Sequence, residues 1–176
     1  MNLIKYIIFA VLSIMAIIHA GKNLYNTESR KFYRFLAFES ILVLFLLNTS
    51  YWFINPFSIA QVLSWIVLCI SLWLLIYGII MFIKVGKPKG HIENTTVLIT
   101  TGCYKFVRHP LYSSLLFLSW GVYLKNPAYP GVIFIILLTV FVYRMSIIEE
   151  KENISKFGED YQEYMKRSKM LIPFLF

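Results

Sequence analysis

The sequence predicts an all-α integral membrane protein with about five transmembrane helices, the last two forming a C-terminal helical hairpin. Its 176 residues are 59% hydrophobic and 18% aromatic, and a soluble domain of this length has too little interior to bury so much apolar surface. The apolar residues are gathered in long runs, and the basic residues lie between alternate runs. Because no repeat and no low-complexity linker divides the chain, we expect a single membrane domain over residues 1–176.

Five apolar runs mark the expected helices. A helix that crosses the hydrocarbon core needs about 20 residues, and all the runs approach this length except the fourth, which is shorter. The runs are Leu3–Ala20, Phe35–Ile54, Ile59–Ile83, Leu111–Leu124 and Gly131–Ile148. Pro127 and Pro130 follow the fourth run and predict a tight reversal. We therefore expect the fourth and fifth helices to form a hairpin that need not cross the full thickness of the bilayer.

The basic residues predict the orientation of the chain. Of the 17 Lys and Arg residues, only Lys5 and Lys125 lie on one side of the membrane in this arrangement. Positive residues favour the cytoplasmic face, so the N-terminus is expected outside and the C-terminus in the cytoplasm, in a cell membrane. The net charge of +8 then reflects topology and contact with membrane lipids. Nucleic acid is excluded as a partner, because no soluble basic domain would present such a surface.

Two segments break the apolar pattern, and both are expected in the cytoplasm. The first, residues 84–110, contains the β-branched stretch TTVLITTG, which is expected to be extended rather than helical. The second begins at Glu149, where charge replaces hydrocarbon, and Gly158 is expected to end or kink its helix. Residues 1–83 are therefore expected to form three transmembrane helices, and residues 84–176 to form the functional region.

Other polar residues have ordinary explanations. Glu39 lies one turn inside the second helix and is expected to pair with Arg34 or Lys31 near the membrane surface. Cys69 and Cys103 lie at different levels and lack metal-binding spacing, so neither a metal site nor a disulfide is expected.

The stretch RHP allows both a structural and a chemical interpretation. Arg108 alone is typical of a basic anchor at the membrane surface, and His109 alone is more often a hydrogen-bonded structural residue. Pro110 is a common first residue of a helix, because its missing N–H costs nothing there. Tyr104 and Tyr112 suit an interfacial aromatic belt. Taken one at a time, these residues leave the function open.

Combined with the C-terminal segment, the same residues form a family pattern. GCYKFVRHPLYSS, a hydrophobic hairpin and EEKENISKFGEDYQEYMKRSKMLIP resemble the isoprenylcysteine carboxyl methyltransferase family and its relatives, the small membrane phospholipid methyltransferases. The matching residues, which cover roughly 84–176, are Gly102, Tyr104, Arg108, His109, Pro110, Tyr112, Glu149, Glu150, Phe157, Gly158, Tyr161, Tyr164 and Pro173. Two positions depart from the pattern. Ser114 replaces a glycine, and Met145, with Arg144 beside it, stands where carboxyl methyltransferases of this family have a substrate-binding arginine.

The resemblance implies an S-adenosyl-L-methionine-dependent methyltransferase that acts on a membrane-embedded or lipid-like acceptor. It implies a cytoplasmic cofactor pocket without a Rossmann domain, formed by Thr96, Val97, Leu98, Ile99, Tyr104, His109, Pro110, Leu111, Tyr112 and Glu149. Glu149 would receive the cofactor's amino group, Arg108 and Glu150 would be catalytic, and Arg144 would bind the substrate. The acceptor, a lipophilic small molecule or a lipidated substrate, would enter through a gap between the third, fourth and fifth helices.

Three other functions are compatible with the sequence. The same fold and cofactor would serve a phospholipid or amine N-methyltransferase. Membrane sterol-type reductases, which use NADPH, have a similar R-H-P-x-Y region but usually more helices. A non-enzymatic membrane scaffold or lipid-binding protein would also suit an apolar chain, although the polar parts of the pattern all lie on one side of the membrane.

Overall fold

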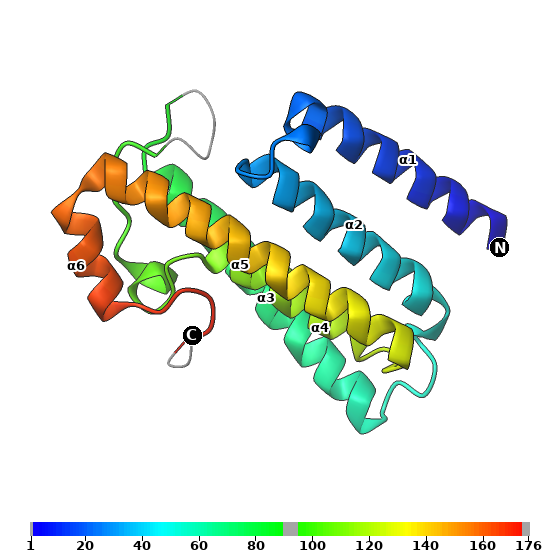
Figure 1. Ribbon diagram of the computed structural model, residues 1–176. Helices are drawn as coiled ribbons and strands as arrows, with labels where there is room; N and C mark the ends of the chain where they lie inside the picture. The colour runs from blue at the N-terminus through cyan, green and yellow to red at the C-terminus, as the bar shows by residue number, and fades with distance from the viewer. Residues whose placement is uncertain (1, 90–94, 174–176) are drawn as a thin grey trace.

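The computed structural model describes residues 2–89 and 95–173, which form one assembly of helices (Figure 1). The α-helices are α1 Asn2–Ala20, α2 Arg30–Asn48, α3 Ile59–Lys84, α4 Pro110–Tyr123, α5 Tyr129–Phe157 and α6 Glu159–Arg167. Short 3₁₀ segments lie at Gly21–Tyr25, Thr49–Tyr51 and Gly102–Lys105. The described ranges contain no β-sheet beyond an isolated bridge between Val107 and Lys169.

Four helices in the described part of the chain are long and apolar enough to cross a membrane. They lie within Leu3–Tyr25, Arg30–Tyr51, Ile59–Lys84 and Tyr129–Phe157. Their outer faces carry many large, exposed apolar side chains, which a lipid solvent tolerates. The predicted all-α integral membrane protein is thereby confirmed. The fourth expected helix is α4, which has 14 residues and is too short to cross the hydrocarbon core by itself.

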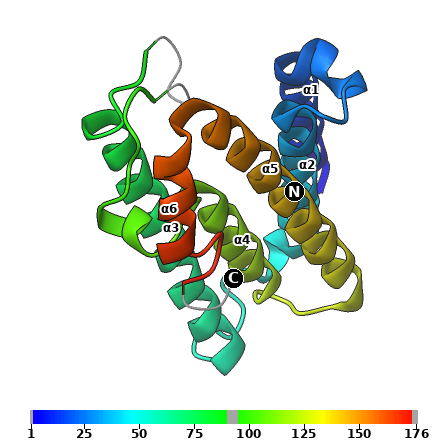
Figure 2. The same cartoon turned by 60° about the vertical axis from the view of Figure 1, so that its left-hand side comes forward.

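The helices pack as neighbouring pairs. α2 packs along α5, α3 packs along α4, and α4 contacts α5, while α1 lies at the edge of the molecule against α2 (Figure 1). α2 and α3 are not among the helices that pack along each other, and α4 and α5 lie between them (Figure 2). α2 and α3 therefore lie on opposite sides of the pair formed by α4 and α5.

The contact between α3 and α4 is close because small residues face it. A Cβ atom on Gly121 would lie 2.7 Å from the Leu68 side chain. The Ser64 hydroxyl donates a hydrogen bond to the Gly121 carbonyl at 2.6 Å, and the Ser71 hydroxyl donates one to the Ser114 carbonyl at 2.7 Å. Small residues and interhelical hydrogen bonds are the usual means by which membrane helices associate, so α3 holds α4 firmly.

The first turn of α4 lies deeper in the molecule than the C-terminal end of α3. A Cβ atom on Gly78 would lie 2.8 Å from the Leu111 side chain, so the start of α4 is level with Gly78. α3 continues to Lys84, which is about 9 Å further at 1.5 Å per residue. α4 is short because its N-terminus is recessed below the surrounding helix ends.

The C-terminal segment returns to the stretch that precedes α4. Gly158, with φ 57°, separates α5 from α6, as expected from its position in the sequence. After α6, the Lys169 amide donates to the Phe106 carbonyl at 3.0 Å, and the Arg108 amide donates to the Lys169 carbonyl at 2.8 Å. These bonds hold the chain end beside the RHP stretch.

Two segments differ in detail from the expectation. α2 begins at Arg30 rather than near Phe35, because the Ser29 side chain caps it by accepting a hydrogen bond from the Lys31 amide. The stretch TTVLITTG is not helical, but it forms no strand either. Instead, the amides of Thr96 and Val97 both donate to the Gly86 carbonyl, at 2.8 and 3.2 Å.

Glu39, the ionisable residue inside the second membrane helix, faces α1. Its carboxylate accepts a hydrogen bond from the Ser13 hydroxyl at 2.9 Å. This bond links α2 to α1 within the membrane-spanning region, where a polar contact between helices replaces contact with lipid.

Candidate functional site

The RHP stretch lies at the recessed N-terminus of α4. Pro110 is the first residue of the helix and His109 is its N-cap, so the preceding backbone turns sharply away from the helix. The His109 amide donates to the Met170 carbonyl at 3.2 Å, and the Ser113 hydroxyl donates to the Leu171 carbonyl at 2.5 Å. The C-terminal segment thus fixes both ends of the turn that presents Arg108 and His109.

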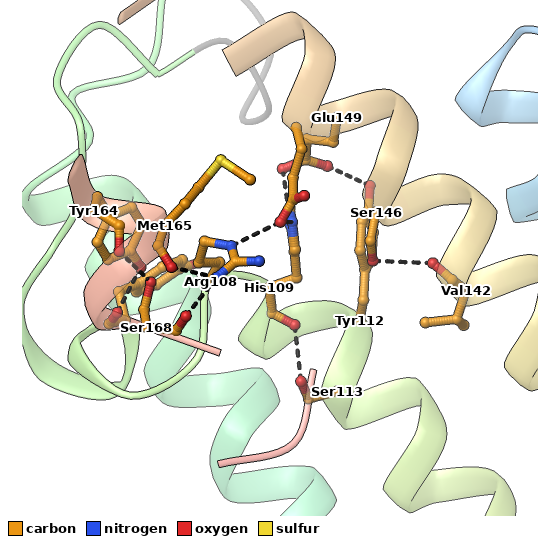
Figure 3. Close-up of polar contacts among 12 residues, drawn as sticks. Arg108, His109, Tyr112, Ser113, Val142, Ser146, Glu149, Tyr164, Met165 and Ser168 are labelled. Carbon is orange, nitrogen blue, oxygen red and sulfur yellow. Dashed lines mark hydrogen bonds and ion pairs between the residues drawn. The ribbon is translucent and has the colours of Figure 1, made fainter. Parts of the chain in front are cut away.

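Arg108 joins α5 to the end of α6 (Figure 3). Its Nε donates to Glu150 Oε1 at 2.7 Å, and the two side chains are each only 9% exposed. One terminal nitrogen donates to the carbonyls of Met165 at 3.2 Å and Ser168 at 2.5 Å. The guanidinium is therefore held in one orientation by a carboxylate and by two backbone carbonyls.

His109 lies between the two glutamates of α5. Its Nδ1 is 3.7 Å from Glu149 Oε1, and its Nε2 is 3.5 Å from Glu150 Oε1. The ring stacks on Tyr112 with the ring centres 5.5 Å apart. Burial by itself lowers the pKa of His109, but the two neighbouring glutamates outweigh burial and raise this pKa.

Glu149 connects three helices. Its Oε2 accepts hydrogen bonds from the Tyr112 hydroxyl on α4 and from Arg30 on α2 at 2.9 Å. A second nitrogen of Arg30 lies 2.9 Å from Glu152, which is one turn further along α5. α2 is therefore tied to the same carboxylate that faces the RHP stretch.

Two cavities meet at these residues. The larger has a volume of about 730 Å³ and opens at the end of the molecule where α1 joins α2 and α5 joins α6, within the size range of small-molecule sites. The smaller, about 230 Å³, extends between α2, α3, α4 and α5. Residues that line both are Arg30, Arg34, Phe82, Tyr104, Arg108 and Glu149. We call these two spaces the polar cavity and the apolar cavity.

The walls of the two cavities differ in chemistry. The polar cavity has basic, acidic and aromatic side chains, among them Lys31, Lys156, Glu152, Phe157 and Tyr161. Beyond the shared residues, the walls of the apolar cavity are mostly hydrophobic and include Phe38, Leu75, Ile79, Leu115 and Met145. The arrangement suits a charged ligand in the polar cavity and an apolar one in the apolar cavity.

Three buried polar atoms of cavity-lining residues make no hydrogen bond within the described structure. They are the Tyr104 hydroxyl, at the junction of the cavities, the Tyr161 hydroxyl and His109 Nε2. Burial, followed by the negative charges of Cys103 and Glu149 in their ionised forms, raises the pKa of Tyr104 far above its usual value, so the phenol remains a donor. Buried donors without partners are uncommon, and a polar ligand at this position would satisfy them.

Most of the residues expected to bind the cofactor lie at the cavities. Leu98, Ile99, Tyr104 and Glu149 line the polar cavity, while His109, Pro110, Leu111 and Tyr112 line the apolar one. Thr96 and Val97 are exposed and line neither; Thr95 lines the polar cavity in their place. The structure thus gathers this set around one junction, apart from Thr96 and Val97.

The residues expected to act in catalysis and substrate binding are placed differently from one another. Arg108 lines both cavities, whereas Glu150 lines neither and instead contacts Arg108 and His109. Arg144 also lines neither cavity; its guanidinium lies over the Tyr33 ring, 5.6 Å from the ring centre. Its neighbour Met145 lines the apolar cavity, because adjacent helix residues point about 100° apart.

The contribution of α2 to the cavities was not expected from the sequence. Arg30, Arg34 and Phe38 all line the apolar cavity, whereas the sequence predicts a role in topology for the two arginines and, for Arg34 or Lys31, pairing with Glu39. The signal was their spacing of four residues, which places all three side chains on one face of a helix. The expected membrane gap also differs, because α2 forms one of its walls in addition to α3, α4 and α5.

Comparison with known proteins identifies methyltransferases. Residues 59–160, more than half of the chain, match the model of a family described as phospholipid methyltransferase. "Methanethiol S-methyltransferase" of Pseudomonas deceptionensis is 26% identical over 141 residues, covering 78% of this chain and 48% of the relative. "Protein-S-isoprenylcysteine O-methyltransferase" of Rattus norvegicus is 29% identical over 159 residues, covering 74% of this chain and 54% of the relative.

A shorter match lies within a third relative. "Methanethiol S-methyltransferase 1" of Bradyrhizobium diazoefficiens is 33% identical over 70 residues, which is 40% of this chain and 24% of that relative. The chain thus spans about half or less of the length of these curated relatives.

Proposed function

Because the chain belongs to the phospholipid methyltransferase family, we propose that it is a membrane methyltransferase that uses S-adenosyl-L-methionine and acts on an acceptor with an apolar part. The observation that carries this proposal is the junction of a polar and an apolar cavity at Glu149, Arg108 and Tyr104. Such a junction brings a water-borne charged donor and a membrane-borne acceptor to one place, with the reacting groups shielded from bulk water.

The polar cavity fits the charged groups of this cofactor. Glu149 is the carboxylate that would bind the cofactor's ammonium, and the Tyr104 hydroxyl is a donor without a partner. Arg108 and the basic residues around the cavity would bind its carboxylate, and the faces of Phe82 and Tyr161 suit a sulfonium. When bound, S-adenosyl-L-methionine supplies an electrophilic methyl group.

Glu150 acts in this proposal as a positioning residue. It lies behind Arg108 and His109 rather than at a cavity wall, and it holds the Arg108 guanidinium at 2.7 Å. The pair therefore fixes the groups that face the cofactor. Alignment of the reactants can remove much of the activation barrier in such a transfer. Loss of Glu150 would therefore slow methyl transfer, even though Glu150 itself does not contact the cofactor in this proposal.

The test is binding of S-adenosyl-L-homocysteine to the purified wild type and to Glu149→Gln, measured by calorimetry. Charge-assisted hydrogen bonds are worth about 1.5–3 kcal/mol, so we expect the variant to bind at least about tenfold more weakly. Glu163→Gln, an exposed acid on α6 that lines neither cavity, is the control for the loss of a negative charge.

A second ligand makes the assignment of Glu149 specific. 5′-Methylthioadenosine lacks the amino-acid part of the cofactor, so its affinity should be the same in the wild type and in Glu149→Gln. Failure of the folded wild type to bind S-adenosyl-L-homocysteine, or binding of NADPH in its place, would refute the proposed function. If Glu149→Gln lost affinity for both nucleosides to the same extent, the role given to Glu149 would be refuted.

A further inference from the structure

Arg30, the first residue of α2, bridges two carboxylates of α5. One terminal nitrogen of its guanidinium lies 2.9 Å from Glu149 Oε2, and the other lies 2.9 Å from Glu152 Oε2. Glu149 and Glu152 are three residues apart and therefore share one face of α5. Arg30 and both glutamates line the polar cavity, so the bridge forms part of the wall at which the cofactor is proposed to bind.

The stability of the fold does not account for this bridge. A cation in the first turn of a helix is repelled by the helix dipole, so Arg30 is unfavourable for α2 itself. The side chains of Arg30 and Glu152 are 20% and 52% exposed, and ion pairs that solvent reaches contribute little to stability. α2 and α5 are held together by an apolar cluster that includes Ile41 of α2 and Leu138 of α5.

Arg30 and Tyr112 fix the Glu149 carboxylate through the same oxygen. Both donate to Oε2, whereas Oε1 lies 3.7 Å from His109 Nδ1, which is longer than an ordinary hydrogen bond. An ionised carboxylate offers about four lone-pair positions, so Oε1 keeps the capacity to accept from a further donor. Because Glu152 holds the other arm of the guanidinium, Arg30 is itself held in place.

We propose that Arg30 and Glu152 are positioning residues: Glu152 holds Arg30, and Arg30 holds Glu149 in the orientation in which Oε1 receives the ammonium of S-adenosyl-L-methionine. This inference rests on the proposed methyltransferase function and adds a residue of α2 to the support of the cofactor site. A glutamate that is already ordered does not lose side-chain freedom when the ligand binds. Loss of the bridge should therefore weaken binding of those ligands that carry the ammonium.

Two substitutions that conserve charge break the bridge. In Arg30→Lys, a single ammonium replaces the fork of the guanidinium and does not reproduce its contacts with both carboxylates. In Glu152→Asp, the side chain is one methylene shorter and the carboxylate is withdrawn from Arg30. In calorimetry, each variant should bind S-adenosyl-L-homocysteine about two- to tenfold more weakly than the wild type. 5′-Methylthioadenosine, which lacks the amino-acid part, should bind to both variants as it does to the wild type.

The double variant tests whether the two residues act through one bridge. Because residues of one network are not additive, Arg30→Lys/Glu152→Asp should bind S-adenosyl-L-homocysteine about as weakly as the weaker single variant. The Glu152 side chain is 52% exposed, so Glu152→Asp should fold even if Arg30→Lys does not. Arg167→Lys and Glu163→Asp, at exposed positions of α6 that line neither cavity, are matched controls and should leave both affinities unchanged.

Three results would overturn this inference. The first is an affinity for S-adenosyl-L-homocysteine that is unchanged or higher in the folded single variants; a higher affinity would mean that Arg30 competes with the ammonium for Glu149. The second is an equal loss of affinity for both nucleosides, which would assign the bridge a purely structural role. The third is additive losses in the double variant, which would mean that Glu152 acts independently of Arg30.

The same measurements separate this inference from the proposed function. If the wild type does not bind S-adenosyl-L-homocysteine, the proposed function fails. If the wild type binds it and Glu149→Gln weakens that binding, but Arg30→Lys and Glu152→Asp do not, this inference alone fails.

Discussion

The ionisable residues of the site are arranged as a network in which each charge has a partner. Arg108 faces Glu150, Arg30 faces Glu149, and His109 lies between the two glutamates. A buried charge that loses its partner costs several kcal/mol, so each residue depends on the others. A well-packed apolar cluster would be at least as stable, which is a physical reason to regard this network as functional rather than structural.

The protonation of His109 should make stability depend on pH. Its pKa is raised in the folded protein above an ordinary value of about 6.5, so its stabilising contribution is complete below about pH 6.5 and is lost as pH rises through the raised pKa. His109→Gln removes this contribution. The difference in melting temperature between wild type and variant should therefore be largest near pH 6 and shrink by a few degrees towards pH 9.

Melting temperatures measured over this pH range in a single detergent provide the check. A difference between wild type and His109→Gln that grows with pH would contradict the raised pKa of His109.

At the scale of elements, α4 depends on two partners that lie far from it in the chain. α3 approaches it closely at Gly78 and Gly121, which sets its depth. The segment after α6 bonds to the backbone before α4 and inserts Leu171, which is 1% exposed, into the core cluster formed with α2, α4 and α5. The position of the RHP stretch is thus set by contacts from both sides.

Leu171 and Ile172 allow this dependence to be tested within one segment. Leu171→Ala should destabilise the protein by about 2–5 kcal/mol, as expected for a buried leucine, and should weaken binding of S-adenosyl-L-homocysteine. Ile172 is 36% exposed, so Ile172→Ala should change stability much less. Thermal unfolding and calorimetry on both variants give the comparison. Equal effects at the two positions would mean that the segment does not anchor the site through Leu171.

At the scale of the whole molecule, the helices place the polar cavity at one end. His19 and Arg30, near the connection between α1 and α2, line it together with residues of α5 and α6. The basic residues gathered at this end predict that it faces the cytoplasm. A cytoplasmic opening would admit a water-soluble cofactor.

Labelling of single cysteines tests this orientation. In a protein with Cys69 and Cys103 replaced by alanine, Lys22→Cys should react with a membrane-impermeant maleimide only in inside-out vesicles. Phe57→Cys, at the other end of the molecule and 92% exposed as phenylalanine, should react in intact cells. The opposite pattern would place the polar cavity outside the cell and contradict the predicted topology.

Several features of this fold were predictable because they depend on local sequence. Long apolar runs require a membrane, Pro110 starts α4, and Gly158, with φ 57°, separates α5 from α6. The importance of Tyr104, His109 and Glu149 was inferred from a family pattern, and these residues do lie around one junction. Their roles as cofactor ligands stay a prediction until binding is measured.

The sequence by itself determined the solvent of this protein, the approximate positions of its helices and the stretches that carry its polar residues, because hydropathy and helix punctuation are local properties. Only the tertiary structure decided that α4 starts at the level of Gly78, that Glu150 lies behind Arg108, and that Arg30 of α2 meets Glu149 of α5. These facts depend on how far each helix is shifted and rotated against its neighbours. That shift and rotation are set by packing between residues distant in the chain, which no local pattern contains.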